Sequence, residues 1–130
     1  MILDTDFIID IMRKEEHAVK KLKEMVSKAE PQIITAPTLF ELYSGVVRSE
    51  KKETEKQQIL HTLSNLIIWH LDPEGAKRGG EIDGRLVKEG QKIDPIDSMI
   101  AGIVLEHGEK LLTRNVKHFS RIAGLKIETY

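Results

Sequence analysis

The stretch that most constrains the fold is an apolar helix predicted over residues 93–107, with one acidic side chain near its start. Asp94 followed by Pro95 is typical of a helix N-terminus, because an aspartate oxygen caps the first amides and proline needs no acceptor there. Residues 99–105 are all apolar or small, which indicates a helix buried on every side. Asp97 lies just before this run, so its carboxylate is expected at the edge of the interior, where an unpaired charge is unfavourable.

Short apolar segments alternate with helical patterns along the rest of the chain, which is typical of an α/β sandwich with a parallel sheet. With 130 residues and no repeat or linker, we expect one domain over residues 1–130. The run 49–56 is interpreted as a solvated loop and first turn, and 114–119 as a loop or short helix. Strands are predicted at 1–3, 33–35, 67–71, 110–113 and 126–128, and the other helices at 7–13, 16–29, 37–48, 59–66 and 76–88.

Composition narrows the classes of function. The net charge is −1, so any contact with nucleic acid must come from a local basic patch rather than from the overall charge. The absence of cysteine and the unpaired spacing of the five histidines disfavour a zinc site. No apolar run has membrane-spanning length and the N-terminus lacks the pattern of a signal peptide, so we expect a cytoplasmic protein.

Acidic and amide side chains occur at predicted strand ends and inside apolar helical turns. Asp4 follows the first strand, and Thr113 and Asn115 end the fourth, at the sheet edge where parallel sheets bind ligands. Glu41 and Asp97 each lie in an apolar turn with no Lys or Arg three or four residues away. Carboxylates gathered together stay ionised only beside a hard cation, and oxygen ligands suit Mg²⁺ or Mn²⁺. A site of this kind most often serves phosphate chemistry.

The same residues also have structural interpretations. Asp94 is favoured as a helix cap over a ligand, and Asp97 fits the N3 acid of a capping box equally well. Glu41 has an alternative as the partner of a distant lysine. Thr5 and Thr113 fit either caps or hydroxyls that orient the adjacent acids.

Further charged residues receive separate interpretations. Asp6 and Asp10 are predicted to be first-turn and solvent-facing acids rather than metal ligands. Isolated basic residues on loops are usually only solvated, but three are also candidates for holding a phosphate backbone. These candidates are Lys92, Arg114 and Lys117.

Four motifs occur in an order and at a chain length that together resemble the PIN domain, specifically the small VapC-type toxin ribonucleases. The resemblance covers essentially the whole chain. The motifs are Leu3-Asp4-Thr5, Glu41-Leu42 with Gly45, Asp97 with Ile100-Ala101, and Thr113-Arg114-Asn115 with Phe119.

The resemblance implies a three-layer α/β/α sandwich with a central parallel sheet. It also implies a Mg²⁺- or Mn²⁺-dependent endoribonuclease, the toxin of a type II toxin–antitoxin pair. Such proteins act on RNA, are usually homodimers, and are inhibited by a VapB-type antitoxin whose C-terminal part covers the acidic site. An apolar face formed by Phe40, Tyr43 and Val47 is a candidate for the dimer interface.

Carried over by position, Asp4, Glu41 and Asp97 match the three core acids of the family, which bind metal and carry catalysis. Asn115 falls where many relatives have a fourth acid, so the resemblance implies one tightly held ion with a water-mediated second. Asp94 matches loosely as an outer ligand. Thr5, Thr113 and Asn115 are expected to support the ligands, and the three basic candidates to contact RNA. Ala101 and Gly102 are expected to permit close packing of the helix on the sheet.

Three other functions remain open. Ile2 to Asp6 also resembles the D-x-D motif of haloacid-dehalogenase-like phosphatases, with Asp4 as nucleophile, although Ile8 matches that motif loosely and a late Lys with an acidic pair is not evident. A non-enzymatic binding module would not need the three acids. An RNA-processing PIN nuclease without an antitoxin has the same sequence features.

Overall fold

Five short strands form one parallel sheet in the computed structural model, which describes all residues from Met1 to Tyr130. The strand order is β3-β2-β1-β4-β5, and every neighbouring pair is parallel. The predicted parallel sheet of short strands is therefore confirmed. The strands are β1 (Ile2–Leu3), β2 (Ile33–Thr35), β3 (Ile67–Trp69), β4 (Lys110–Leu112) and β5 (Lys126–Glu128).

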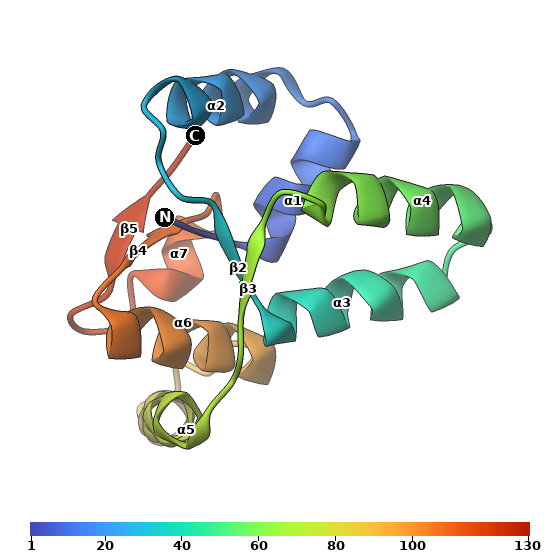
Figure 1. The fold of residues 1–130 in the computed structure, drawn as a ribbon. Helices are drawn as coiled ribbons and strands as arrows, with labels where there is room; N and C mark the ends of the chain where they lie inside the picture. Colours follow the sequence, from blue (N-terminus) through green and yellow to red (C-terminus); the bar gives the residue numbers. More distant parts are fainter.

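Seven helices cover the two faces of this sheet, which gives the three layers seen in Figure 1. None of them combines the length and hydrophobicity that a membrane span requires. The helices are α1 (Thr5–Met12), α2 (Glu16–Ser27), α3 (Ala36–Val47), α4 (Lys52–Leu63), α5 (Pro73–Lys88), α6 (Pro95–His107) and α7 (Val116–Phe119).

Alternating residues of the central strands point into two hydrophobic cores, one on each face of the sheet. Leu3 and Leu112 pack with residues of α1 to α4, whereas Ile2 and Leu111 pack with residues of α5 to α7. Both faces of the sheet are therefore buried, as is usual for parallel sheets. The predicted α/β/α sandwich is confirmed by this arrangement.

The predicted apolar helix is α6, which packs against both the sheet and α5. Asp94 caps it by accepting a hydrogen bond from the Ile96 amide at 2.8 Å, and Gly108 ends it in the left-handed conformation. Six of its residues, from Ser98 to Val104, are buried.

The start of one helix differs from the prediction. Helix α4 begins at Lys52, so most of the run 49–56 is helical rather than loop. Its charged residues remain in solvent while Ile59 is buried, because α3 and α4 lie side by side as a pair that projects from the sheet (Figure 1).

The expected role of Gly102 in helix–sheet packing is wrong. A Cβ atom at this position would collide with the backbone of Gly75 and Gly79, both in α5. Gly102 therefore permits two helices to approach closely, while Ala101 is buried in the core of the sheet face.

Candidate active site

Asp4 is fixed at the carboxyl end of β1 by hydrogen bonds to both of its oxygens. Oδ1 accepts from the Thr5 amide at 2.8 Å and thereby caps α1. Oδ2 accepts from the hydroxyl of Thr113 at 2.7 Å. Thr113 follows β4, the strand next to β1, so the parallel pairing of these strands brings the two side chains together.

Glu41 reaches the same edge of the sheet from α3. Its Oε1 accepts from the hydroxyl of Thr5 at 2.6 Å, and the Thr5 hydroxyl lies 3.4 Å from that of Thr38. Partial burial raises the pKa of Glu41, with further increases from the charges of Asp94 and Asp6. No lysine pairs with Glu41, so the alternative of a distant lysine partner is not realised.

Asp97 points toward these acids from the first turn of α6. It forms no hydrogen bond or ion pair with the protein, so the capping-box interpretation is not realised even though Asp94 does cap the helix. Burial and then the charges of Asp4 and Glu41 raise the pKa of Asp97 from 3.8 to about 7. No protein group therefore compensates the negative charge that Asp97 carries when it is ionised.

A pocket of about 510 Å³ joins these side chains at one edge of the sheet. Burial raises the pKa of Asp4 from 3.8 to about 6, and the neighbouring charges of Asp6 and Glu41 add to the effect. The polar residues that line the pocket are Asp4, Thr5, Asp6, Glu41, Ser44, Arg48, Asp94, Asp97, Asn115 and His118.

The donor set of this pocket suits a hard divalent cation. The acids supply only oxygen ligands, and their mutual repulsion is the condition that a bound cation relieves. No three acidic or histidine side chains form a ready-made chelate as they stand. Mg²⁺ usually retains several waters and needs only one or two carboxylates, so the residues fit an ion of this type.

Three pocket residues were missed or assigned elsewhere by sequence reasoning. His118 lies one turn after Asn115, whose Nδ2 is 3.0 Å from His118 Nδ1. Arg48, which directly follows the last residue of α3, lies seven residues, or two helical turns, after Glu41. Helical spacing from the predicted site residues was the available signal for both. Asp6 also lines the pocket rather than facing only solvent.

The prediction of a solvent-facing Asp10 is wrong. Asp10 is buried, with 4% of its side chain exposed, and Arg114 pairs with it at 2.8 Å. Helix α1 turns this side chain inward, toward the end of β5. There the hydroxyl of Tyr130 also donates to it. Neither Lys92 nor Lys117 lines the acidic pocket, and the side chains of both are exposed.

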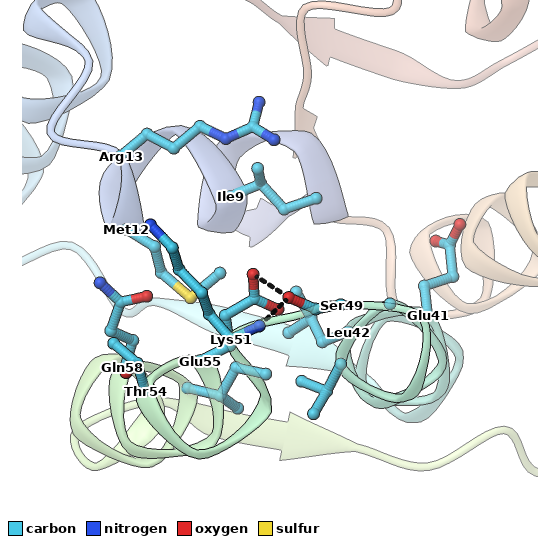
Figure 2. Close-up of a pocket in the computed structure, with 13 residues that line it drawn as sticks. Ile9, Met12, Arg13, Glu41, Leu42, Ser49, Lys51, Thr54, Glu55 and Gln58 are labelled. Atoms are coloured by element: carbon cyan, nitrogen blue, oxygen red, sulfur yellow. Dashed lines mark hydrogen bonds between the residues drawn. The ribbon is translucent and has the colours of Figure 1, made fainter.

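A second pocket of about 500 Å³ adjoins the acidic one between α1, α3 and α4. The two share Ile9, Glu41 and Gly45. Figure 2 shows Glu41 at one end, apart from Met12 of α1 and the polar side chains of α4. This apolar-floored groove therefore leads to the acids.

Comparisons with known proteins agree over nearly the full chain. The model of the PIN domain family matches residues 1–125. A protein of Salmonella typhimurium named tRNA(fMet)-specific endonuclease VapC is 31% identical over 130 residues, which cover 99% of this chain and 96% of that protein. Ribonuclease VapC2 of Haemophilus influenzae is 29% identical, with coverage of 99% and 96%. Among solved structures, a chain of VapBC2 from Rickettsia felis, bound to a DNA fragment from its promoter, has a TM-score of 0.90 at 27% identity and coverage of 99% and 97%.

Proposed function

This chain belongs to the PIN domain family, and on that premise we propose that it is a Mg²⁺- or Mn²⁺-dependent endoribonuclease and the toxin of a toxin–antitoxin pair. The observation that carries the proposal is the pocket in which Asp4, Glu41 and Asp97 converge with raised pKa values. Carboxylates in this state stay fully ionised at neutral pH only beside a cation, and two relatives that match over nearly the full chain are named tRNA(fMet)-specific endonuclease and ribonuclease.

Each side chain has a distinct role in this proposal. Asp4, Glu41 and Asp97 would hold the ion, which supplies the positive charge that activates water and neutralises phosphate oxygens. Thr113 and Thr5 keep Asp4 and Glu41 oriented by hydrogen bonds of 2.7 and 2.6 Å. Asn115 completes the pocket beside His118. Hydrolysis of the phosphodiester leaves a 5′-phosphate and a 3′-hydroxyl.

We further propose two protein partners. A VapB-type antitoxin would occupy the groove of Figure 2, which shares Glu41 with the acidic pocket, so an inserted segment would cover the acids. A second copy of the chain would cover the exposed apolar face of α3. Phe40 and Val47 on that face are 65% and 70% exposed, which is costly for a free surface.

Cleavage assays test the nuclease proposal. Purified protein is incubated with a mixed-sequence single-stranded RNA and with an initiator tRNA transcript, in Mg²⁺, Mn²⁺ or EDTA. We expect metal-dependent cutting that Asp97→Asn abolishes and that Glu81→Gln, an exposed acid on α5, retains. Metal-independent cutting, or full activity of Asp97→Asn, would contradict the assignment.

Two simpler assays address the alternative functions. One alternative makes Asp4 the nucleophile of a phosphatase, and its position at the carboxyl end of β1 fits that role as well. Hydrolysis of an aryl phosphate without RNA cleavage would support that alternative. Growth arrest on expression, relieved by co-expression of a neighbouring small antitoxin gene, would distinguish a toxin from an RNA-processing nuclease.

A further inference from the structure

An ion pair between buried Asp10 and half-exposed Arg114 lies beside the acidic pocket and takes no part in the chemistry proposed above. The guanidinium of Arg114 donates through Nη1 to both oxygens of Asp10, at 3.0 and 2.8 Å. The hydroxyl of Tyr130 donates to Asp10 Oδ2 at 2.7 Å. These residues belong to α1, to the loop after β4 and to the last position of the chain.

The sheet brings Tyr130 to this place. Strands β4 and β5 are parallel, with Leu112 opposite Glu128, so the residues after both strands emerge at the same edge. The Tyr130 ring packs edge-on against Phe7, with centroids 4.8 Å apart. Burial and then the hydrogen bond to Asp10 raise the pKa of Tyr130 above its ordinary value.

The ion pair places one edge of the guanidinium at the rim of the acidic pocket. Arg114 Nε lies 3.7 Å from Oδ2 of Asp6, a residue that lines the pocket, and 49% of the Arg114 side chain is exposed. Nη2 donates to no protein atom. Along the chain, Arg114 lies between Thr113, which orients Asp4, and Asn115, which lines the pocket.

We propose that Asp10 and Tyr130 are positioning residues that hold the Arg114 guanidinium at this rim, where it binds a backbone phosphate of the RNA strand. The proposal rests on the ribonuclease function proposed above. The acidic pocket is lined by five acids, and its basic side chains are Arg48 and His118. Arg114 at the rim supplies a further positive charge, which favours the approach of a polyanion.

The chemistry of the guanidinium favours this role. Its planar donors match phosphate oxygens, and fixing it beforehand reduces the entropy lost on binding. The pairing with Asp10 uses Nη1 alone, so Nη2 has no protein partner and is free to bind a phosphate oxygen. The contact with Asp6 is long and exposed, so a phosphate can replace it at small cost.

Single-turnover cleavage of the single-stranded RNA tests the proposal, with the half-saturating RNA concentration and the maximal rate measured at several salt concentrations. Arg114→Gln should raise the half-saturating concentration roughly tenfold, as for loss of one charge-assisted hydrogen bond, with a much smaller effect on the maximal rate. The slope of the logarithm of affinity against the logarithm of salt concentration should become shallower by about 0.7, the value for one phosphate contact on a single strand.

Two further variants test whether the effect of Arg114→Gln comes from lost phosphate binding rather than from the change in net charge or from lower stability. Lys77→Gln removes the same charge from an exposed site on α5 without an ion pair, and should leave both quantities unchanged. Tyr130→Phe keeps the packing on Phe7 but removes the hydroxyl. It should raise the half-saturating concentration by a smaller factor than Arg114→Gln, with the maximal rate retained.

The outcomes distinguish the two proposals. Cleavage by Arg114→Gln with the wild-type half-saturating concentration and salt slope would overturn the role of Arg114 alone. If thermal unfolding shows Arg114→Gln to be unfolded, an unchanged half-saturating concentration in Tyr130→Phe overturns the positioning role. A wild-type protein that leaves every RNA intact contradicts the ribonuclease function, and the role of Arg114 falls with it.

Discussion

One side-chain hydroxyl, that of Thr113, helps to orient Asp4. Its hydrogen bond of 2.7 Å to Oδ2, together with the Thr5 amide on Oδ1, leaves the carboxylate one conformation. Glu41 is held in a comparable way by the Thr5 hydroxyl. Asp97 differs from both, because no protein group donates to it, and burial raises its pKa to about 7, above the value of about 6 for Asp4.

Replacing Thr113 with Val removes the hydroxyl and nearly preserves the volume. We expect RNA cleavage to fall by roughly 10- to 100-fold, as for other residues that orient a metal ligand. Thr113→Ser, which retains the hydroxyl, should keep most of the activity. Equal rates for the Val and Ser variants would mean that the hydrogen bond to Asp4 has no role in orientation.

The raised pKa of Asp97 predicts how the stability of the metal-free protein depends on pH. Because the folded state holds the proton more tightly than the unfolded chain, the stabilising contribution is complete below about pH 4 and is lost as the pH rises toward about 7. Asp97→Asn should therefore raise the free energy of unfolding at pH 8 and change it little at pH 4. Urea unfolding in EDTA measures both values, and a variant that destabilises equally at the two pH values would refute this account.

At the scale of elements, the contact of α5 with α6 determines how α6 presents Asp97. Gly102 of α6 meets the backbone of Gly75 and Gly79 with no space for a side chain. Asp72 caps α5 by accepting from the Gly75 amide at 2.8 Å, so the first turn of α5 is fixed at this contact. At this crossing point the two helices therefore touch through glycine rather than through interlocking side chains.

Gly102→Ala should destabilise the protein, because its Cβ would collide with backbone atoms of α5 rather than with the movable end of a side chain. We expect a loss of roughly 1–3 kcal/mol in the free energy of unfolding, the usual cost of overpacking. Gly84→Ala is the matched control, since a Cβ there meets nothing within 4 Å. It should stabilise the helix by roughly 0.5–1 kcal/mol, so the free energy of unfolding is expected to rise in this control and to fall in Gly102→Ala.

On the scale of the whole molecule, the sheet order gathers the acids at one edge. Strand β1 lies between β2 and β4, so Asp4 is flanked by the segments that carry Glu41 and Thr113. Helix α6 then closes the pocket with Asp97. Four distant segments thus contribute one pocket, and a ligand bound there links them in the folded state.

Mg²⁺ should accordingly raise the melting temperature of the wild-type protein, because an ion that binds only the folded state stabilises it. The Asp4→Asn, Asp97→Asn double variant should show no such increase. Thermal unfolding with Mg²⁺ and with EDTA measures the shift in each protein. Equal shifts in both would place the ion elsewhere on the molecule.

Local interactions explain what the sequence determined by itself. The start of α6 at Asp94 and Pro95, its apolar run and the strand positions follow from capping and hydrophobic pattern, which act over a few residues. The resemblance of four short motifs indicated the family and named Asp4, Glu41 and Asp97, which the structure brings to one pocket. Their metal binding and catalysis stay predictions until the assays above are made.

Only the tertiary structure decided which distant side chains meet. The burial of Asp10, its pairing with Arg114 and the contact with Tyr130 join residues more than a hundred positions apart, and no local pattern encodes them. The partner of Gly102 likewise depends on the helix that packs against α6. These features follow from strand order and helix packing. The surroundings of a side chain come from segments far away in the sequence, and its own sequence neighbours do not determine where those segments lie.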